Sequence, residues 1–294
     1  MGAAGAGHGE RMGPLLALAS AACYGLVDFL GGLLSRRIHF AVVTFLGQVG
    51  GLLFAVVAAV LVPADAIRTA DVLWGALSGC GSAVAMHFLN RGLSRGAMSI
   101  VVPVSAVTGI ALSVLCGVCF LGDRPTPLAW LGIGVTAPAL WLVSGGGVRT
   151  RRGRRPAAGR PASMDGLTAS LGVALQYVCL AQADPAGGLW PIAAGRLAAV
   201  LLLLPHTWQY ASHFRQPPRL LGQAALIGAG AALGLTLYLL AAQQQMLAIA
   251  VVLASLYPAI PTVLGLAALH EKVTGRQVVG LLSAGAAVVL LSLG

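Results

Sequence analysis

The feature that most constrains this chain is an internal repeat at a separation of 148 residues. The stretch from Leu73 to Gly146 reappears as the stretch from Leu221 to Gly294. The matched pairs include Met98 and Met246, Asp123 and Glu271, Gly132 and Gly280, and Ser144 and Ser292. Because both copies are strongly apolar, the chain is predicted to be a duplicated membrane protein, in which a solute path usually lies where the copies meet.

The small number of charged residues supports this placement. Charged residues make up 9% of the chain and apolar residues 58%, whereas a soluble domain carries roughly a quarter charged residues. The net charge of +10 does not indicate nucleic-acid binding, because six basic residues lie in one linker and most others flank apolar runs, which is the pattern of topology signals. All five cysteines fall inside apolar runs without a metal-ligand set, so no metal or cofactor is expected.

Continuous apolar runs predict ten transmembrane helices, because about 17 to 25 apolar residues span the hydrocarbon. These runs lie at 13–34, 40–62, 72–93, 97–121, 127–145, 166–184, 188–205, 220–242, 246–269 and 276–293. The predicted fold is an all-α membrane protein with a tail at 1–12, a five-helix repeat at 13–146, an arginine-rich linker at 147–164 and a second five-helix repeat at 165–294. Since five is odd, the second repeat is inserted upside down, giving an inverted repeat.

The basic residues predict the orientation in the membrane. Connections after the odd-numbered spans hold fourteen lysines and arginines, and the opposite side holds three. Basic residues concentrate on the cytoplasmic side. We therefore expect the linker 148–164 to be cytoplasmic in a multi-pass protein of the plasma or inner membrane, with both termini outside.

Several short motifs resemble the repeat of the EamA-type transporters of the drug/metabolite transporter superfamily. In the first half, Val102-Pro103-Val104-Ser105 is followed by Leu121-Gly122-Asp123-Arg124-Pro125-Thr126 and Trp130-Leu131-Gly132. The second half is similar at Leu253-Ala254-Ser255-Leu256-Tyr257-Pro258, then Glu271, Gln277 and Gly280. Tyr24-Gly25, Asp28-Phe29 and the run from Gly188 to Arg196 are also similar to this family. One departure is Asp123, where the family usually has glutamate.

The resemblance implies a ten-helix carrier that works by alternating access. It would export or exchange a small metabolite, such as an amino acid or a drug-like solute, with protons as a candidate coupling partner. One alternative is an uncoupled facilitator or channel. Another is an intramembrane enzyme, which is disfavoured because the sequence has no cluster of catalytic residues. A fused repeat forms a whole path in one chain, so a monomer or a dimer is compatible with transport.

Ionisable residues at membrane depth are the leading site candidates, because an unpaired charge is costly in lipid. Arg196 could hold a carboxylate or phosphate, and the 148-residue shift places Gln48 on it. Asp28 shares a helix face with Ser20 and Tyr24 and could couple transport to protons. The alternative for Arg196 is a permanent pair with Asp28 or with a carbonyl at a helix C-terminus. The alternative for Asp28 is a salt bridge with an arginine such as Arg36 or Arg196.

Other polar residues in apolar runs complete the candidate set. His87 shares a face with Asn90 and is predicted either to relay protons or to hydrogen-bond a neighbouring helix. Such residues line a solute path or join helices. The remaining candidates are Gln176, Tyr177, Tyr238, Ser255 and Tyr257.

Prolines and acids mark spans four and nine. Pro103, Pro258 and Pro261 are expected to bend these helices, either as hinges or as static kinks. Asp123 and Glu271 follow the same spans. We expect each acid to cap the helix that comes after it, with a gating salt bridge as the alternative.

Overall fold

The computed structural model describes residues 6–116, 118–119, 126–144, 162–244, 257–271 and 273–293. Within these ranges the chain is helical and contains no strand. The helices are α1 (Ala6–Arg37), α2 (Phe40–Leu61), α3 (Thr69–Arg95), α4 (Met98–Cys116), α5 (Pro127–Ser144), α6 (Ala162–Leu180), α7 (Trp190–Trp208), α8 (Pro218–Gln244), α10 (Ala259–Ala268) and α11 (Gly275–Leu293), with short 3-10 turns η2 (Pro185–Gly187) and η3 (Ala211–Phe214).

The predicted spans coincide with these helices, but not all of them qualify as spans by length and composition. Within the described residues, five helices are long and apolar enough to cross a membrane: α1, α2, α3, α7 and α8. Shorter apolar helices occur in α4, α5, α10 and α11, whereas α6 is in neither group. The ten-span count therefore stays a prediction. Residues 246–256 of the ninth predicted span and residues 147–161 of the linker lie outside the described residues.

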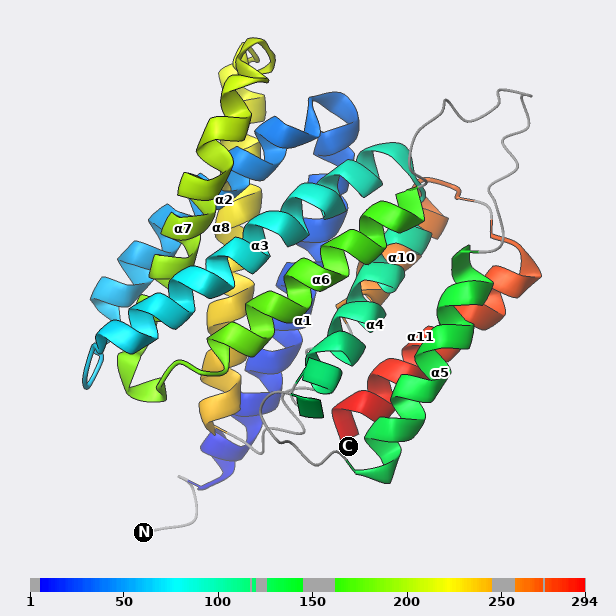
Figure 1. Ribbon diagram of the computed structural model, residues 1–294, viewed down its shortest axis with the longest axis horizontal. Coiled ribbons are helices and arrows are strands. Elements are labelled where there is room, and N and C mark those ends of the chain that lie inside the picture. The colour runs from blue at the N-terminus through cyan, green and yellow to red at the C-terminus, as the bar shows by residue number, and fades with distance from the viewer. Residues whose placement is uncertain are drawn as a thin grey trace.

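Helices of one repeat pack mainly on helices of the other. α3 lies against α6 and α7, while α8 lies against α1 and α2, and α5 pairs with α11 at one edge of the bundle (Figure 1). The 148-residue shift converts α3 into α8, α6 into α1 and α7 into α2, so the first two sets of contacts are equivalents. The junction of the repeats therefore runs through the centre of the bundle.

Two glycine crossings allow this close packing. A Cβ on Gly79 of α3 would overlap the carbonyl of Gly195 in α7, and a Cβ on Gly228 of α8 would overlap the carbonyl of Gly47 in α2. Gly47 and Gly195 are themselves equivalent in the repeat. Small residues let membrane helices approach until their backbones touch, so these crossings set the distance between the repeats.

Most of the arginines that the structure describes lie at one end of the bundle. Helices α1, α3 and α7 finish there and α8 and α11 begin there (Figure 1). We call it the basic end; it carries Arg36, Arg37, Arg91, Arg95, Arg215, Arg219 and Arg276. At the opposite end, Arg68 pairs with Asp184 at 2.8 Å, and Asp71 accepts a hydrogen bond from the Asp184 backbone at 2.9 Å. This pattern is the one-sided charge bias that the sequence predicts.

Candidate functional site

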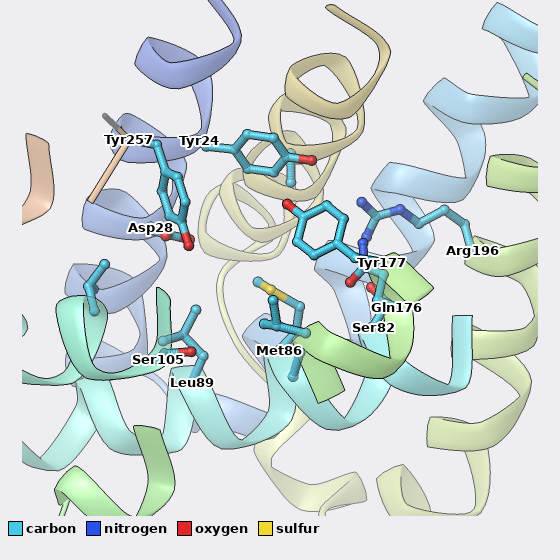
Figure 2. Close-up of a pocket in the computed structure, with 14 residues that line it drawn as sticks. Tyr24, Asp28, Ser82, Met86, Leu89, Ser105, Gln176, Tyr177, Arg196 and Tyr257 are labelled. Atoms are coloured by element: carbon cyan, nitrogen blue, oxygen red, sulfur yellow. The ribbon is translucent and has the colours of Figure 1, made fainter. Parts of the chain in front are cut away.

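A cavity of about 70 Å³ lies where the repeats meet. Side chains from α1, α3, α4, α6, α7 and α8, together with Tyr257, face it (Figure 2). Its lining residues are Tyr24, Asp28, Ser82, Ala85, Met86, Leu89, Val102, Ser105, Val173, Gln176, Tyr177, Arg196, Ala231 and Tyr257. Six of the residues predicted from the sequence are thus brought together: Tyr24, Asp28, Gln176, Tyr177, Arg196 and Tyr257.

Asp28 provides the negative pole of the cavity. It lies on α1 and is 8% exposed. Tyr24, Tyr177 and Tyr257 line the cavity with it, and Tyr257 lies beside it (Figure 2). The rings of Tyr24 and Tyr257 lie 5.9 Å apart and are tilted by 53°. The acid therefore shares the cavity with three tyrosines, and no basic side chain of the described residues pairs with it.

Arg196 provides the positive pole. It lies on α7, is 6% exposed, and donates a 2.9 Å hydrogen bond from Nη1 to Oε1 of Gln48 on α2. Gln48 in turn donates from Nε2 to the Ser82 hydroxyl at 3.4 Å. Gly51 leaves space for the arginine, because a Cβ there would lie 3.4 Å from its Cδ and Nε. The guanidinium is thus held in place by a neutral partner.

The salt bridge between Asp28 and Arg196, which the sequence left open as an alternative, is not among the ion pairs of the described residues. α7 packs on α2 and α3, whereas α1 packs mainly on α8, so the two charges approach the cavity from different sides. In the described part of the chain, no ion pair or hydrogen bond reaches the Asp28 carboxylate, and Arg36 binds elsewhere. Figure 2 shows Asp28 and Arg196 at opposite sides of the cavity, with tyrosine rings between them. Neither buried side chain therefore has an ion-pair partner in the part of the chain that the structure describes.

The four most polar positions of the site form two equivalent pairs. The 148-residue shift places Asp28 on Gln176 and Gln48 on Arg196. Each pair has one charged and one amide side chain. The charged member comes from the first repeat in one pair and from the second repeat in the other, so the duplicated site has an unequal distribution of charge.

The sequence reasoning missed three polar or polarisable lining residues. Ser82, Met86 and Ser105 all face the cavity (Figure 2). Ser105 belongs to the Val-Pro-Val-Ser motif, so the sequence did contain a signal that could have indicated this lining residue. Nothing in the sequence distinguishes Ser82 and Met86 from other small or apolar residues of α3.

Several predicted candidates lie away from the cavity. Ser20 is fully buried and donates to the Gly234 carbonyl at 2.7 Å, so it joins α1 to α8. Asn90 donates to the Thr44 hydroxyl at 3.0 Å and lines a smaller cavity of about 20 Å³ with Gln48 and Arg196. Tyr238 packs on an apolar cluster that includes Ala55 and Leu235. Ser255 lies outside the described residues.

His87 lies in an aromatic cluster toward the basic end. Its ring centroid is 5.0 Å from that of His206 and 5.1 Å from that of Phe40. Tyr210 continues the cluster to His39, whose ring it stacks on at 4.4 Å, and His213 lies 4.5 Å from His39. Burial, with His213, His206 and Arg95 nearby, lowers the pKa of His39. The cluster joins α2, α3, α7 and η3, and His87 is not a cavity residue.

Glu271 connects three segments at the basic end. Its carboxylate accepts hydrogen bonds from the backbone N–H groups of Met98 at 2.9 Å and Ser99 at 3.0 Å, and from the Ser99 hydroxyl at 2.8 Å. Arg36 adds an ion pair at 3.2 Å and also donates to the carbonyls of Leu93 and Gly96. Burial alone would raise the pKa of Glu271, but the hydrogen bonds from Ser99, Met98 and Arg36 hold it below its usual value.

This arrangement corrects the prediction for Glu271. The residue does cap a helix N-terminus, but that helix is α4 rather than the following α11, and the ion pair accompanies the cap. The N-terminus of α11 is instead capped locally by hydrogen bonds between Thr274 and Gln277. Asp123 lies outside the described residues.

The predicted hinge prolines differ in their surroundings. Pro103 lies inside the continuous helix α4. Pro258 is the residue before α10, and Pro261 lies in its first turn, where a missing N–H is tolerated. The residues before 257 are not described, so a bend across Pro258 stays a prediction.

Within the described residues, no group of three or more metal-ligating side chains occurs.

Comparisons with known proteins agree with this architecture. The model of the EamA-like transporter family matches twice, at residues 11–145 and 166–293. The chain therefore belongs to the EamA-like transporter family of the drug/metabolite transporter superfamily, with one family unit in each of its inverted repeats. It is a multi-pass membrane transporter of small molecules.

Solved structures support the fold alone. One, described only as a crystal structure of a protein, matches with a TM-score of 0.57 at 15% identity and covers 94% of this chain and 95% of that chain. No curated protein sequence matches the chain significantly.

Proposed function

We propose that the chain is a secondary active carrier that moves a small metabolite across the plasma or inner membrane by alternating access. The observation that carries this proposal is the central cavity, where Asp28 and Arg196 are buried and neither has an ion-pair partner within the described residues. A purely structural protein would neutralise such charges, because a buried unpaired charge destabilises the fold. A solute that binds between them removes that cost.

The connections at the basic end support alternation. Glu271, Arg36 and the N-terminus of α4 tie α1, α4 and the α10–α11 connection together by hydrogen bonds and an ion pair. We propose that these contacts break together when this end of the bundle opens. An element with two discrete arrangements is what alternating access requires. We propose that this end faces the cytoplasm, since the arginines gather there.

The alternative is an uncoupled facilitator or channel. Exchange kinetics distinguish a channel from a carrier, and the response to an ion gradient distinguishes an uncoupled facilitator from a coupled carrier. A carrier exposes one site to one side at a time, so unlabelled substrate inside a vesicle drives transient accumulation of labelled substrate from outside. A channel only equilibrates the two compartments.

The test begins with a thermal-shift screen of the purified protein against amino acids, sugars, nucleotides and cationic drugs. Proteoliposomes preloaded with a stabilising compound are then given the labelled compound outside. Transient accumulation supports a carrier, and simple equilibration refutes it. Repeating the uptake with and without a pH gradient tests protons as the coupling ion, and equal rates exclude them.

A further inference from the structure

The cavity has two opposite charges at separate points, and the two repeats contribute one each. From this arrangement we infer that the transported solute is a small zwitterion, with its ammonium group at Asp28 and its carboxylate at Arg196. The inference rests on the proposed carrier function and specifies the chemical class of its substrate.

The Asp28 side of the cavity suits an ammonium group. Figure 2 shows the ring of Tyr257 beside Asp28, and the rings of Tyr24 and Tyr177 between Asp28 and Arg196. A cation over an aromatic ring is attracted by the ring's negative face, and this attraction is stronger away from water. Carboxylate and rings together therefore recognise a positive group.

The Arg196 side suits a carboxylate. Gln48 occupies Nη1 of the guanidinium, and the Ser82 hydroxyl orients Gln48 from the other side. Within the described residues, the other guanidinium nitrogens of Arg196 have no hydrogen-bond partner. A planar guanidinium binds both oxygens of a carboxylate, and a fixed orientation reduces the entropy lost on binding.

The repeat explains why both charges are needed for recognition. At each pair of equivalent positions, one repeat has an amide where the other has a charge: Gln176 opposite Asp28 and Gln48 opposite Arg196. Two amides alone, without the charges, would bind a neutral polar solute in either orientation. The single acid and single base make the cavity dipolar, and a solute with only one charge would leave the other protein charge buried without compensation.

The cavity also limits the size of the zwitterion. A volume of about 70 Å³ has room for about five to seven water-sized groups, at roughly 10–15 Å³ for each. A small amino acid or a compound of similar size fits this space in the present conformation. Nucleotide conjugates and sugar phosphates are too large for it.

Three probes matched in size separate the two charges: alanine, alaninamide and isobutyrate. Alaninamide keeps only the positive charge and isobutyrate only the negative one. Competition against counterflow of labelled alanine in proteoliposomes is expected to rank alanine about ten- to a hundred-fold above each of the others, because each loses one charge-assisted hydrogen bond. If either probe competes as well as alanine, the zwitterion proposal is wrong, while a carrier function remains supported by the counterflow itself.

Variants assign each pole to its charge. Asp28→Asn is expected to remove the preference for alanine over isobutyrate, and Arg196→Gln the preference for alanine over alaninamide. Asp65→Asn and Arg215→Gln, in exposed connections, are matched controls that keep both preferences. If Arg196→Gln does not fold, Arg196→Lys keeps the charge without the planar group. This variant should lose only part of the preference for alanine over alaninamide.

Several results would overturn the assignment. A preference that survives its own variant shows that the residue does not bind that group. Loss of both preferences in either single variant shows a structural effect rather than recognition of one charge. If no compound in the broad screen undergoes counterflow, the carrier function itself is contradicted. Counterflow of a compound with a single charge instead supports a carrier and contradicts the zwitterion proposal.

Discussion

Replacing Glu271 with glutamine tests the connection between α4, α1 and the α10–α11 segment. Glutamine keeps one acceptor oxygen, so either the Met98 N–H, which binds Oε1, or the two Ser99 groups, which bind Oε2, lose their acceptor. Both residues are fully buried. An unsatisfied buried donor costs about 1–3 kcal/mol. Loss of the negative charge at a helix N-terminus costs about 0.3–1 kcal/mol, and loss of the partly exposed Arg36 pair about 0.2–1 kcal/mol. The expected total is about 1.5–5 kcal/mol.

Thermal unfolding in detergent, followed by tryptophan fluorescence, measures this loss. By the scaling of soluble domains, the midpoint should fall by roughly 3–20 °C. Arg36→Ala should also be destabilising, because Arg36 donates to two backbone carbonyls and to Glu271. Arg37→Ala is the matched control, since Arg37 lies exposed at the same helix end and makes none of these bonds.

The effect of pH follows from the lowered pKa of Glu271. The folded protein binds this proton less readily than the unfolded chain, whose carboxyl has an ordinary value of 4.5. The stabilisation is therefore complete above about pH 4.5 and is lost as the pH falls through the folded pKa. The difference between wild type and Glu271→Gln should be constant near neutral pH and shrink in acid. A midpoint unchanged in the variant, or equal losses for Arg36→Ala and Arg37→Ala, would refute this reasoning.

Two further predictions concern packing and acid sensitivity. Gly228→Ala should destabilise the protein by about 1–3 kcal/mol by forcing α8 away from Gly47. Gly222→Ala on the same helix meets open space and should be neutral or slightly stabilising. Similar unfolding midpoints for the two variants would contradict the close crossing of α8 and α2. His39→Asn keeps an N-cap for α2 but cannot be protonated. Because the pKa of His39 is lowered, its contribution is present above about pH 6.5 and lost as the pH falls through the folded pKa, so the variant should show a smaller fall in midpoint between about pH 7 and about pH 5.

The order of helices could be predicted from the sequence because lipid imposes a simple length rule. The run 40–62 became α2 at Phe40–Leu61, and 276–293 became α11 at Gly275–Leu293. Packing partners could not be predicted in this way. Lipid contact and helix contact both favour apolar residues, so hydropathy does not show that α3 lies against α6 and α7.

The charged residues of the site were predictable because few charges lie at membrane depth. Helix-face reasoning was less accurate. Ser20, Tyr24 and Asp28 are each four residues apart, and four residues overshoot one helical turn by about 40°. Over two such steps the stripe turns from α8, which Ser20 contacts, to the cavity, which Asp28 faces.

Long-range contacts explain the remaining errors. The sequence places Glu271 directly before α11, yet the folded chain brings it to the first turn of α4, 173 residues away from Met98 along the chain. His87 likewise contacts His206 of α7 rather than a solute. Neither contact leaves a local pattern in the sequence.

The hydrogen bond between Gln48 and Arg196 has a geometric consequence. The two residues occupy the same position in their respective repeats, and they bond to each other at 2.9 Å. Equivalent residues in contact lie on the axis that relates the two copies. If the inward-open and outward-open forms differ by an exchange of shape between the copies, points on that axis are the ones that do not move. This bond should therefore be a stationary centre, around which both ends of the protein open in turn.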